Sequence, residues 1–192
     1  MNIAQLNGIC WGIFIIVWSL GAIYNLFKAP TVIQRRFPYD GLIAGVLVWV
    51  VMQYTPPGYW TFVTFHVPWL QMVGTVLLIA STMYILWARF VIGKMWASHA
   101  VVKEGHKLVT TGPYRFTRHP IYSGLFGMIL GSAISLGHGL IFLGFIIALL
   151  IFMNRIRVEE NLMISTFGDQ YIQYKKRVPQ LIPGIKFRGK QD

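Results

Sequence analysis

Two clusters of residues in the C-terminal half contain the side chains that could perform chemistry. The first cluster comprises, in chain order, His106, Lys107, Leu108, Val109, Tyr114, Arg118, His119 and Tyr122. In the second, Arg155 and Glu159 stand four positions apart, so they share one face of a helix, and Glu160 follows. A carboxylate can accept hydrogen bonds from a ribose diol, an arginine or histidine can hold a ligand carboxylate, and a tyrosine ring can lie beside adenine. These residue types predict a polar cofactor pocket without identifying its cofactor.

Both clusters also have a purely structural interpretation. Gly112-Pro113 is ordinary turn chemistry, Pro120 suits the first position of a helix, and basic residues beside it could anchor that helix at lipid headgroups. The Arg155–Glu159 pair could be a surface ion pair worth roughly 0.3–0.5 kcal/mol, with the basic residue in the weaker, N-terminal position. The functional interpretation depends on finding ionisable groups at a membrane boundary.

The sequence lacks the motifs of several other enzyme classes. It contains no dinucleotide-binding G-x-G-x-x-G after a strand, no complete P-loop, no G-x-S-x-G nucleophile elbow and no H-E-x-x-H zinc motif. The five histidines lack metal-ligand spacing, and Cys10 is the single cysteine. We therefore predict neither a metal site nor an internal disulfide.

The composition indicates a membrane environment for these clusters. Of the 192 residues, 55% are hydrophobic and 12% are charged, whereas soluble proteins carry about 25% charged residues. A net charge of +11 is also typical of nucleic-acid binders. Because the chain has long apolar runs, we favour membrane lipids as the partners of the basic residues and predict no nucleic-acid partner.

Five apolar segments predict an all-α integral membrane protein with five transmembrane helices. The segments cover, approximately, residues 9–27, 41–54, 69–92, 121–136 and 140–153. The first would span roughly 28 Å, close to the ~30 Å hydrocarbon core, whereas the second would span only roughly 21 Å. Helices are expected rather than a barrel because the runs lack the alternation of barrel strands, and lipid cannot satisfy exposed backbone groups.

The basic residues predict the orientation of these helices. All 17 Lys and Arg fall in the loop after the first helix, between the end of the third helix and the fourth, or after the fifth helix. These three stretches lie on one side of the membrane if the N-terminus is outside and the C-terminus is cytoplasmic. We therefore predict a multi-pass protein whose active site is on the cytoplasmic side.

The link Gly137-His138-Gly139 predicts that helices four and five form a tight hairpin. A hairpin brings both polar clusters to the same end, beneath the loop 99–114. Four small residues spaced by four predict a close packing seam, expected against helix five: Ser123, Gly127, Gly131 and Ser135. We predict one domain, with lipid- and substrate-side helices over residues 1–92 and a cofactor-binding loop, hairpin and C-terminal segment over residues 93–192.

The two clusters together resemble the signature of isoprenylcysteine carboxyl methyltransferases and related phospholipid methyltransferases. The first block of resemblance contains His106 to Tyr114 and Arg118 to Gly124. The second contains Arg155, Glu159, Glu160, Phe167, Gly168, Tyr171 and Tyr174 to Pro179. The resemblance covers roughly residues 99–183, and the chain is similar to a minimal five-helix prokaryotic or archaeal member of the family. Residues 1–90 match no motif.

The resemblance implies S-adenosyl-L-methionine as the methyl donor and a membrane-embedded, lipophilic or prenylated acceptor. The residues implied in cofactor binding are His106, Lys107, Leu108, Val109, Tyr114, His119, Pro120, Ile121, Tyr122 and Glu159. Arg155 matches the position that would orient a substrate carboxylate, and Lys103 is a weaker candidate. An amine acceptor would have to lose a proton, for which Glu160 or His119 is the candidate base.

Three alternatives stay open at the level of sequence. The acceptor could be a phospholipid amine, which would make the protein an N-methyltransferase. Membrane sterol-type reductases carry a similar Arg-His-Pro-x-Tyr block and use NADPH. A non-enzymatic membrane component is the third alternative. The sequence leaves open the acceptor, the role of the N-terminal half, the oligomeric state and the organism.

Overall fold

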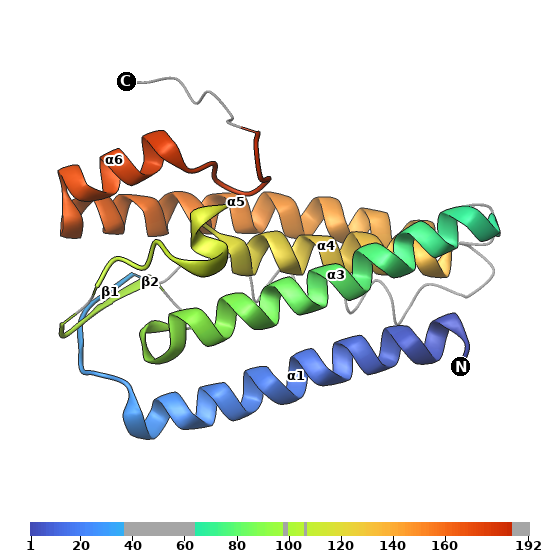
Figure 1. Ribbon diagram of the computed structural model, residues 1–192, viewed down its shortest axis with the longest axis horizontal. Helices are drawn as coiled ribbons and strands as arrows, with labels where there is room; N and C mark the ends of the chain where they lie inside the picture. Colours follow the sequence, from blue (N-terminus) through green and yellow to red (C-terminus); the bar gives the residue numbers. More distant parts are fainter. Residues whose placement is uncertain (37–63, 98–99, 106, 186–192) are drawn as a thin grey trace.

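Long apolar helices dominate the described part of the chain (Figure 1). The structure is a computed structural model that describes residues 1–36, 64–97, 100–105 and 107–185. Its elements are α1 (Ile3–Lys28), β1 (Val32–Arg36), α3 (Pro68–Ile92), β2 (Ala100–Lys103), α4 (Pro120–Leu136), α5 (Gly139–Phe167) and α6 (Asp169–Arg177), with short 3₁₀ turns at Gly93–Met95 and Gly112–Arg115.

Four of the five predicted apolar segments coincide with helices. α1, the stretch Pro68–Met95 and α5 are long and apolar enough to cross a membrane, and α4 is a shorter apolar helix of 17 residues. The predicted second helix, residues 41–54, lies outside the described residues. A capping box starts α1, in which Asn2 accepts from the Gln5 backbone and Gln5 accepts from the Asn2 backbone. The described chain is therefore a mainly helical protein with three candidate membrane spans.

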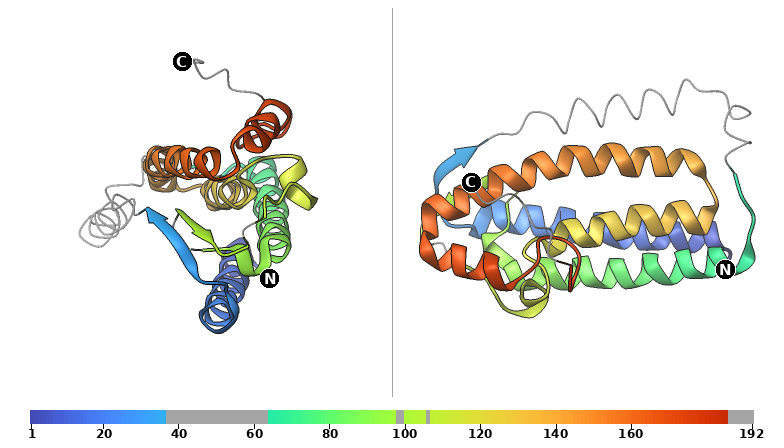
Figure 2. Two further views of the ribbon diagram at one scale, coloured as in Figure 1. Left: turned by 90° about the vertical axis from the view of Figure 1, so that its left-hand side faces the viewer. Right: turned by 90° about the horizontal axis from the view of Figure 1, so that it is seen from above.

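The helices α3, α4 and α5 lie side by side, with α4 in the middle and α1 against α3 (Figure 2). The predicted hairpin between α4 and α5 is present. Gly137 ends α4 in the left-handed conformation with φ +67°, where a side chain would also collide with the carbonyl oxygen of Phe65. This turn places the beginning of α4 and the far end of α5 at the same end of the molecule.

Gly127 and Gly131 of the predicted small-residue seam pack against α3, so the expectation that this seam faces helix five was wrong. A Cβ on Gly124 would meet Ile85, one on Gly127 would meet Ser81, and one on Gly131 would meet the backbone of Leu78. The opposite face of α4 carries bulky rings, and it is these that meet α5: Tyr122 and Phe126 pack with Phe145 and Phe152. The small face therefore permits the closest backbone approach, to α3.

α5 is much longer than its apolar segment, which was predicted to end near residue 153. The helix continues to Phe167 and stops at Gly168, whose φ is +51°. Hydropathy marks where contact with lipid ends, whereas helical hydrogen bonding continues for as long as the residues allow it. α6 then folds back along the end of α5 (Figure 1).

A two-stranded antiparallel ribbon, which the all-α prediction did not include, lies at the same end of the molecule. β1 pairs with β2 from Val32 opposite Lys103 to Arg36 opposite Ala100. The ribbon closes the space beside the polar end of α5, with Val102 packing against Leu162. Strand pairing between segments about 70 residues apart leaves no local periodicity for sequence reasoning to detect.

Candidate active site

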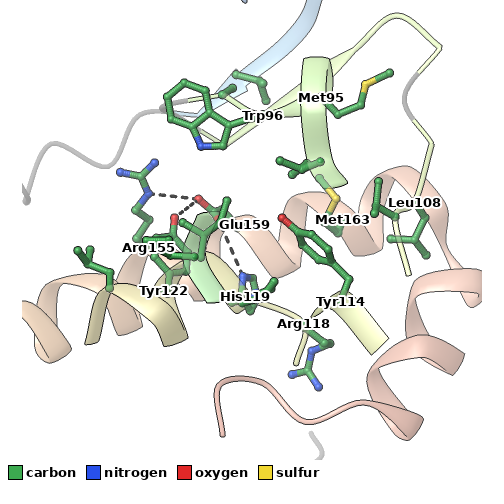
Figure 3. Close-up of a pocket in the computed structure, with 18 of the residues that line it drawn as sticks. Met95, Trp96, Leu108, Tyr114, Arg118, His119, Tyr122, Arg155, Glu159 and Met163 are labelled. Carbon is green, nitrogen blue, oxygen red and sulfur yellow. Dashed lines mark hydrogen bonds and ion pairs between the residues drawn. The ribbon is translucent and has the colours of Figure 1, made fainter. Parts of the chain in front are cut away.

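A cavity of about 440 Å³ lies at the end of the bundle where the two polar clusters meet (Figure 3). Its walls come from α1, the end of α3, the loop after β2, the beginning of α4, the outer part of α5 and α6. This volume is in the range of small-molecule and cofactor pockets. Polar groups gather on the α4–α5 side, and apolar side chains such as Phe14, Ile85 and Leu125 line the rest.

Glu159 lies at the centre of the polar side of the cavity. Its Oε1 accepts a hydrogen bond from the Tyr122 hydroxyl at 2.5 Å and one from Arg155 Nε at 3.2 Å. Its Oε2 is 3.7 Å from His119 Nδ1. The guanidinium of Arg155 lies 5.8 Å from the centre of the Tyr122 ring. The side chain of Glu159 is 21% exposed, so this carboxylate can reach a ligand in the cavity.

His119 is positioned by the chain that follows α6. The backbone amides of Arg118 and His119 donate to the carbonyls of Pro179 and Gln180, and the Ser123 hydroxyl donates to the carbonyl of Leu181. The imidazole is stacked beside the ring of Tyr122, at 5.8 Å between ring centres. It lies between two carboxylates, with Nδ1 toward Glu159 and Nε2 3.3 Å from Glu160. Pro120, which begins α4 directly after it, keeps this residue outside the helix.

Glu160 points to a different environment from that of its neighbour. Arg118 donates to its Oε1 through Nε at 2.8 Å and Nη2 at 2.6 Å, and Lys175 Nζ lies 3.0 Å from its Oε2. Gln180 adds a contact of 3.3 Å. The residue is 4% exposed and is not among those that line the cavity. Its carboxylate ties the beginning of α4 to α6 and to the segment after α6.

Buried tyrosines close the side of the cavity next to α6. The Tyr174 hydroxyl donates to the backbone carbonyl of Tyr114 at 2.6 Å, and both tyrosines line the cavity together with Tyr171. Burial raises the pKa of all three phenols well above its usual value. They stay neutral at physiological pH, and they offer ring faces and hydroxyl donors rather than negative charge.

Comparison with known proteins shows which family this arrangement is similar to. Residues 72–165 match the family model of isoprenylcysteine carboxyl methyltransferases. The protein-S-isoprenylcysteine O-methyltransferase of Schizosaccharomyces pombe is 44% identical over 92 residues, and that of Xenopus laevis is 34% identical over 125 residues. The structure of a eukaryotic intramembrane Ras methyltransferase matches with a TM-score of 0.60 and 28% identity. Over this region the chain is similar to members of this family.

The family match is partial in length. The alignments cover 63% of this chain and 43% of the Xenopus laevis protein, and 46% of this chain and 39% of the Schizosaccharomyces pombe protein. The structural match covers 78% of this chain and 54% of the Ras methyltransferase. The matched region contains most of α3, all of α4, and α5 as far as Ser165, so the family likeness includes the helices that carry the polar side of the cavity.

Most of the site residues predicted from sequence lie around this one cavity. The residues that line it are Lys107, Leu108, Val109, Tyr114, His119, Pro120, Ile121, Tyr122, Arg155 and Glu159. Glu160 lies behind this wall, His106 lies outside the described residues, and the side chain of Lys103 is likewise not described. No group of acidic, histidine or cysteine residues within the described ranges could hold a metal ion.

Sequence reasoning did not identify the wall formed by the first and third helices. Phe14 and Trp18 of α1 and Met95 and Trp96, just beyond α3, line the cavity opposite the polar groups. Met163 was also missed. These side chains lie in apolar stretches without a motif, where a tryptophan is ordinarily interpreted as an interfacial anchor. The early position of Trp18, 88 residues before the first polar cluster begins, left no signal that it belongs to the site.

Proposed function

We propose that the chain is an integral membrane enzyme that transfers a methyl group from S-adenosyl-L-methionine to a lipophilic or prenylated acceptor, with isoprenylcysteine carboxyl methylation as the closest model. The observation that carries the proposal is a cavity that is polar on one side and apolar on the other, in a chain similar to this family. Glu159, Arg155 and His119 converge on the polar side, and apolar side chains of α1, α3 and α4 form the other. Such a cavity suits a polar cofactor beside an apolar acceptor.

The residues present fit the proposed cofactor. Glu159 offers a carboxylate to a ribose diol, and His119 or an arginine offers a donor to a ligand carboxylate. The backbone around Leu108 and Val109 can meet an adenine edge, with Tyr114 presenting a neutral ring beside it. S-adenosyl-L-methionine supplies an already activated sulfonium methyl group when bound. The chain therefore has to align the acceptor rather than provide strong acid–base catalysis.

The environment of the acid–base candidates supports a carboxylate acceptor over an amine. A carboxylate is ionised at neutral pH, so it needs no base, and Arg155 would orient it through charge-assisted hydrogen bonds. An amine acceptor needs a base, and Glu160 is surrounded by Arg118 and Lys175 away from the cavity. His119 would be the remaining candidate. The apolar lining would exclude water from the reacting groups.

The proposed topology extends the described structure. Five transmembrane helices, with residues 41–54 as the second, would place the N-terminus outside and the C-terminus in the cytoplasm. The distribution of all 17 Lys and Arg supports this orientation. The cavity, which lies at the end of the bundle near α6, would then open on the cytoplasmic side. Residues 1–92 would provide the acceptor side of the site and residues 93–192 the cofactor side.

Calorimetric titration of detergent-purified protein with S-adenosylhomocysteine tests the cofactor directly. We expect saturable binding, weakened about tenfold or more by Glu159→Ala, because a hydrogen bond to a charged group is lost. Glu104→Ala is the matched control, since Glu104 is an exposed residue of the β1–β2 ribbon region, where it accepts from Thr31 outside the cavity. Binding of NADPH in its place would contradict the proposal and support a membrane reductase.

Methylation of an S-prenylated N-acylcysteine in detergent or liposomes tests the acceptor. We expect transfer of a radiolabelled methyl group to the carboxylate, giving a base-labile ester. The matched comparison is the same lipid with its carboxylate replaced by an amide. A product formed only on phosphatidylethanolamine, stable to base, would instead assign the chain to the amine N-methyltransferases.

A further inference from the structure

We propose that Arg89, which does not itself line the cavity, is a positioning residue that holds the Trp18–Trp96 pair as the acceptor-side wall of the site. This inference rests on the proposed function and deepens it, because it names what orders the apolar half of the cavity. The wall consists of two rings from segments far apart in sequence, one on α1 and one directly after the 3₁₀ turn that follows α3.

Arg89 is a buried cation in an apolar region. It lies in the last turn of α3, is 5% exposed, and donates through Nη1 to the carbonyl of Gly93 at 3.0 Å. Within the described residues it forms no ion pair, and its Nε has no hydrogen-bond partner. Burying a charge in this way costs free energy unless the surroundings compensate. One carbonyl at a helix end provides only part of that compensation.

Two tryptophan rings provide the rest. The guanidinium carbon of Arg89 lies 4.6 Å from the centre of the Trp96 ring and 5.9 Å from that of Trp18. The two rings meet edge to face, 5.4 Å apart at 81°. Both distances are in the range of cation–π attraction, for which tryptophan is the best partner. The cation therefore stabilises one particular arrangement of the two rings.

α1 is shaped to accept this cluster. Trp18, Gly21 and Asn25 are spaced by three and four residues, so they share one face of the helix. A Cβ on Gly21 would fall on the Arg89 guanidinium, with Cζ 2.9 Å and Nε 3.0 Å away, and the absence of a side chain there makes the room. Asn25 donates to the backbone carbonyl of Trp96 at 3.0 Å. Trp96 is thus held by its backbone from α1 and by its ring from Arg89.

The wall faces the part of the cavity assigned to the acceptor. Trp96 lies on the side of the cavity toward which Arg155 extends, away from Leu108 and Tyr114 (Figure 3). Phe14 continues the apolar lining from Trp18 along α1. An acceptor whose carboxylate met Arg155 would place its apolar part against these rings. Loss of Arg89 should therefore affect acceptor binding far more than cofactor binding.

The alternative is that Arg89 only caps α3. A cap stabilises the helix end and predicts a lower unfolding temperature with no selective effect on the acceptor. A positioning role predicts a rise in the KM for the acceptor while the dissociation constant for S-adenosylhomocysteine stays unchanged. Measuring both the KM for the acceptor and the dissociation constant for S-adenosylhomocysteine therefore distinguishes the two alternatives.

The first test compares Arg89→Met with Arg115→Met. The guanidinium carbon of Arg115 also lies over an aromatic ring, 5.1 Å from the centre of the Phe116 ring. Neither Arg115 nor Phe116 lines the cavity. For Arg89→Met we expect the KM for an S-prenylated N-acylcysteine to rise about fivefold to tenfold, as loss of a partly desolvated cation–π pair implies. The affinity for S-adenosylhomocysteine should stay within about twofold, and the control should change neither. Equal losses for both ligands, or a lower unfolding temperature alone, would overturn the inference.

A second variant moves Arg89 without replacing it. Gly21→Ala should push the flexible guanidinium away from the rings and raise the same KM, although alanine favours the helix. Gly12→Ala is the control, because a Cβ there meets nothing within 4 Å. Tryptophan fluorescence reports the environment of Trp18 and Trp96 without requiring turnover. Both Arg89→Met and Gly21→Ala should change the emission spectrum, and the control variants should not. Unchanged tryptophan emission in both variants would contradict the inference even if methyl transfer were confirmed. A wild-type protein that transfers no methyl group would instead contradict the proposed function.

Discussion

At the scale of single residues, the site separates two neighbouring carboxylates into two roles. Glu159 and Glu160 are adjacent on α5, about 100° apart around the helix axis, so their carboxylates meet opposite nitrogens of the His119 ring and otherwise have different partners. Glu159 meets Tyr122 and Arg155 at the cavity, and Glu160 meets Arg118 and Lys175 behind it. Of these two neighbouring glutamates, Glu159 can therefore contact a ligand, whereas Glu160 stabilises the structure.

Replacing Arg155 should impair turnover of a carboxylate acceptor. For Arg155→Ala we expect kcat/KM to fall about tenfold to hundredfold, because a charge-assisted hydrogen bond to the acceptor is lost. Steady-state kinetics with a prenylated cysteine measures this effect. Arg157→Ala is the control, since Arg157 is exposed on the other side of the same helical turn and does not line the cavity. An equal effect of both variants would point to general electrostatics rather than to orientation.

Replacing Glu160 should destabilise the protein more than it weakens ligand binding. Glu160→Gln removes the charge that faces Arg118 and Lys175, and leaving the buried guanidinium of Arg118 without its ion-pair partner costs about 3 kcal/mol or more. Thermal unfolding in detergent should show the loss, while residual S-adenosylhomocysteine binding per folded molecule changes little. A stable variant that has lost only activity would instead assign Glu160 a direct role in catalysis.

At the scale of elements, the position of the site depends on how closely α3 and α4 pack. The glycines of α4 let its backbone approach α3, and the bulky face of α4 meets α5. α4 therefore brings His119 and Tyr122 between the end of α3 and the polar turns of α5. A wider spacing would open the cavity between its polar groups and the wall formed by Trp18 and Trp96.

A side chain placed in this seam should destabilise the fold. Gly131→Ala would put a methyl group against the backbone of Leu78 and the carbonyl of Gly74, neither of which can move without shifting α3. We expect a loss of about 1–3 kcal/mol in the free energy of unfolding. Gly144→Ala on α5 is the control, because its Cβ would meet nothing within 4 Å. Chemical or thermal unfolding in detergent compares the two, and equal stabilities would contradict close packing at this seam.

At the scale of the whole molecule, polar and apolar surfaces are arranged for a membrane. Exposed large hydrophobic side chains are spread along the described helices, among them Leu20, Phe27, Met72, Val76, Phe90 and Leu150. In water such a surface would cause aggregation, whereas in lipid it is the expected outer surface. The cavity and its charged groups lie together at one end of the bundle.

The predicted orientation can be measured by cysteine labelling. In a Cys10→Ala background, Ala4→Cys and Gln173→Cys place single thiols at exposed positions near the two ends of the described chain. We expect a membrane-impermeant maleimide to label position 4 from outside intact cells, and position 173 only after the membrane is permeabilised. Labelling of position 173 in intact cells would reverse the topology and place the cavity outside.

Local features of the sequence were enough to predict most of the described helices and the grouping of the polar clusters. Lipid demands long apolar helices, so α1, α3, α4 and α5 were predictable, and Gly137 marked the end of α4. The polar clusters were predictable because their residues are close in sequence and the hairpin had to bring them together. Their grouping around one cavity follows from the same constraint.

Only the tertiary structure decided which surfaces meet. It placed the glycine face of α4 against α3, turned Glu160 away from the cavity, and set Trp18 and Trp96 beside each other around Arg89. These choices depend on the rotation of each helix about its axis and on contacts between residues far apart in the chain. Neither hydropathy nor motif spacing records them, because both describe a helix alone, whereas packing is a property of pairs of helices.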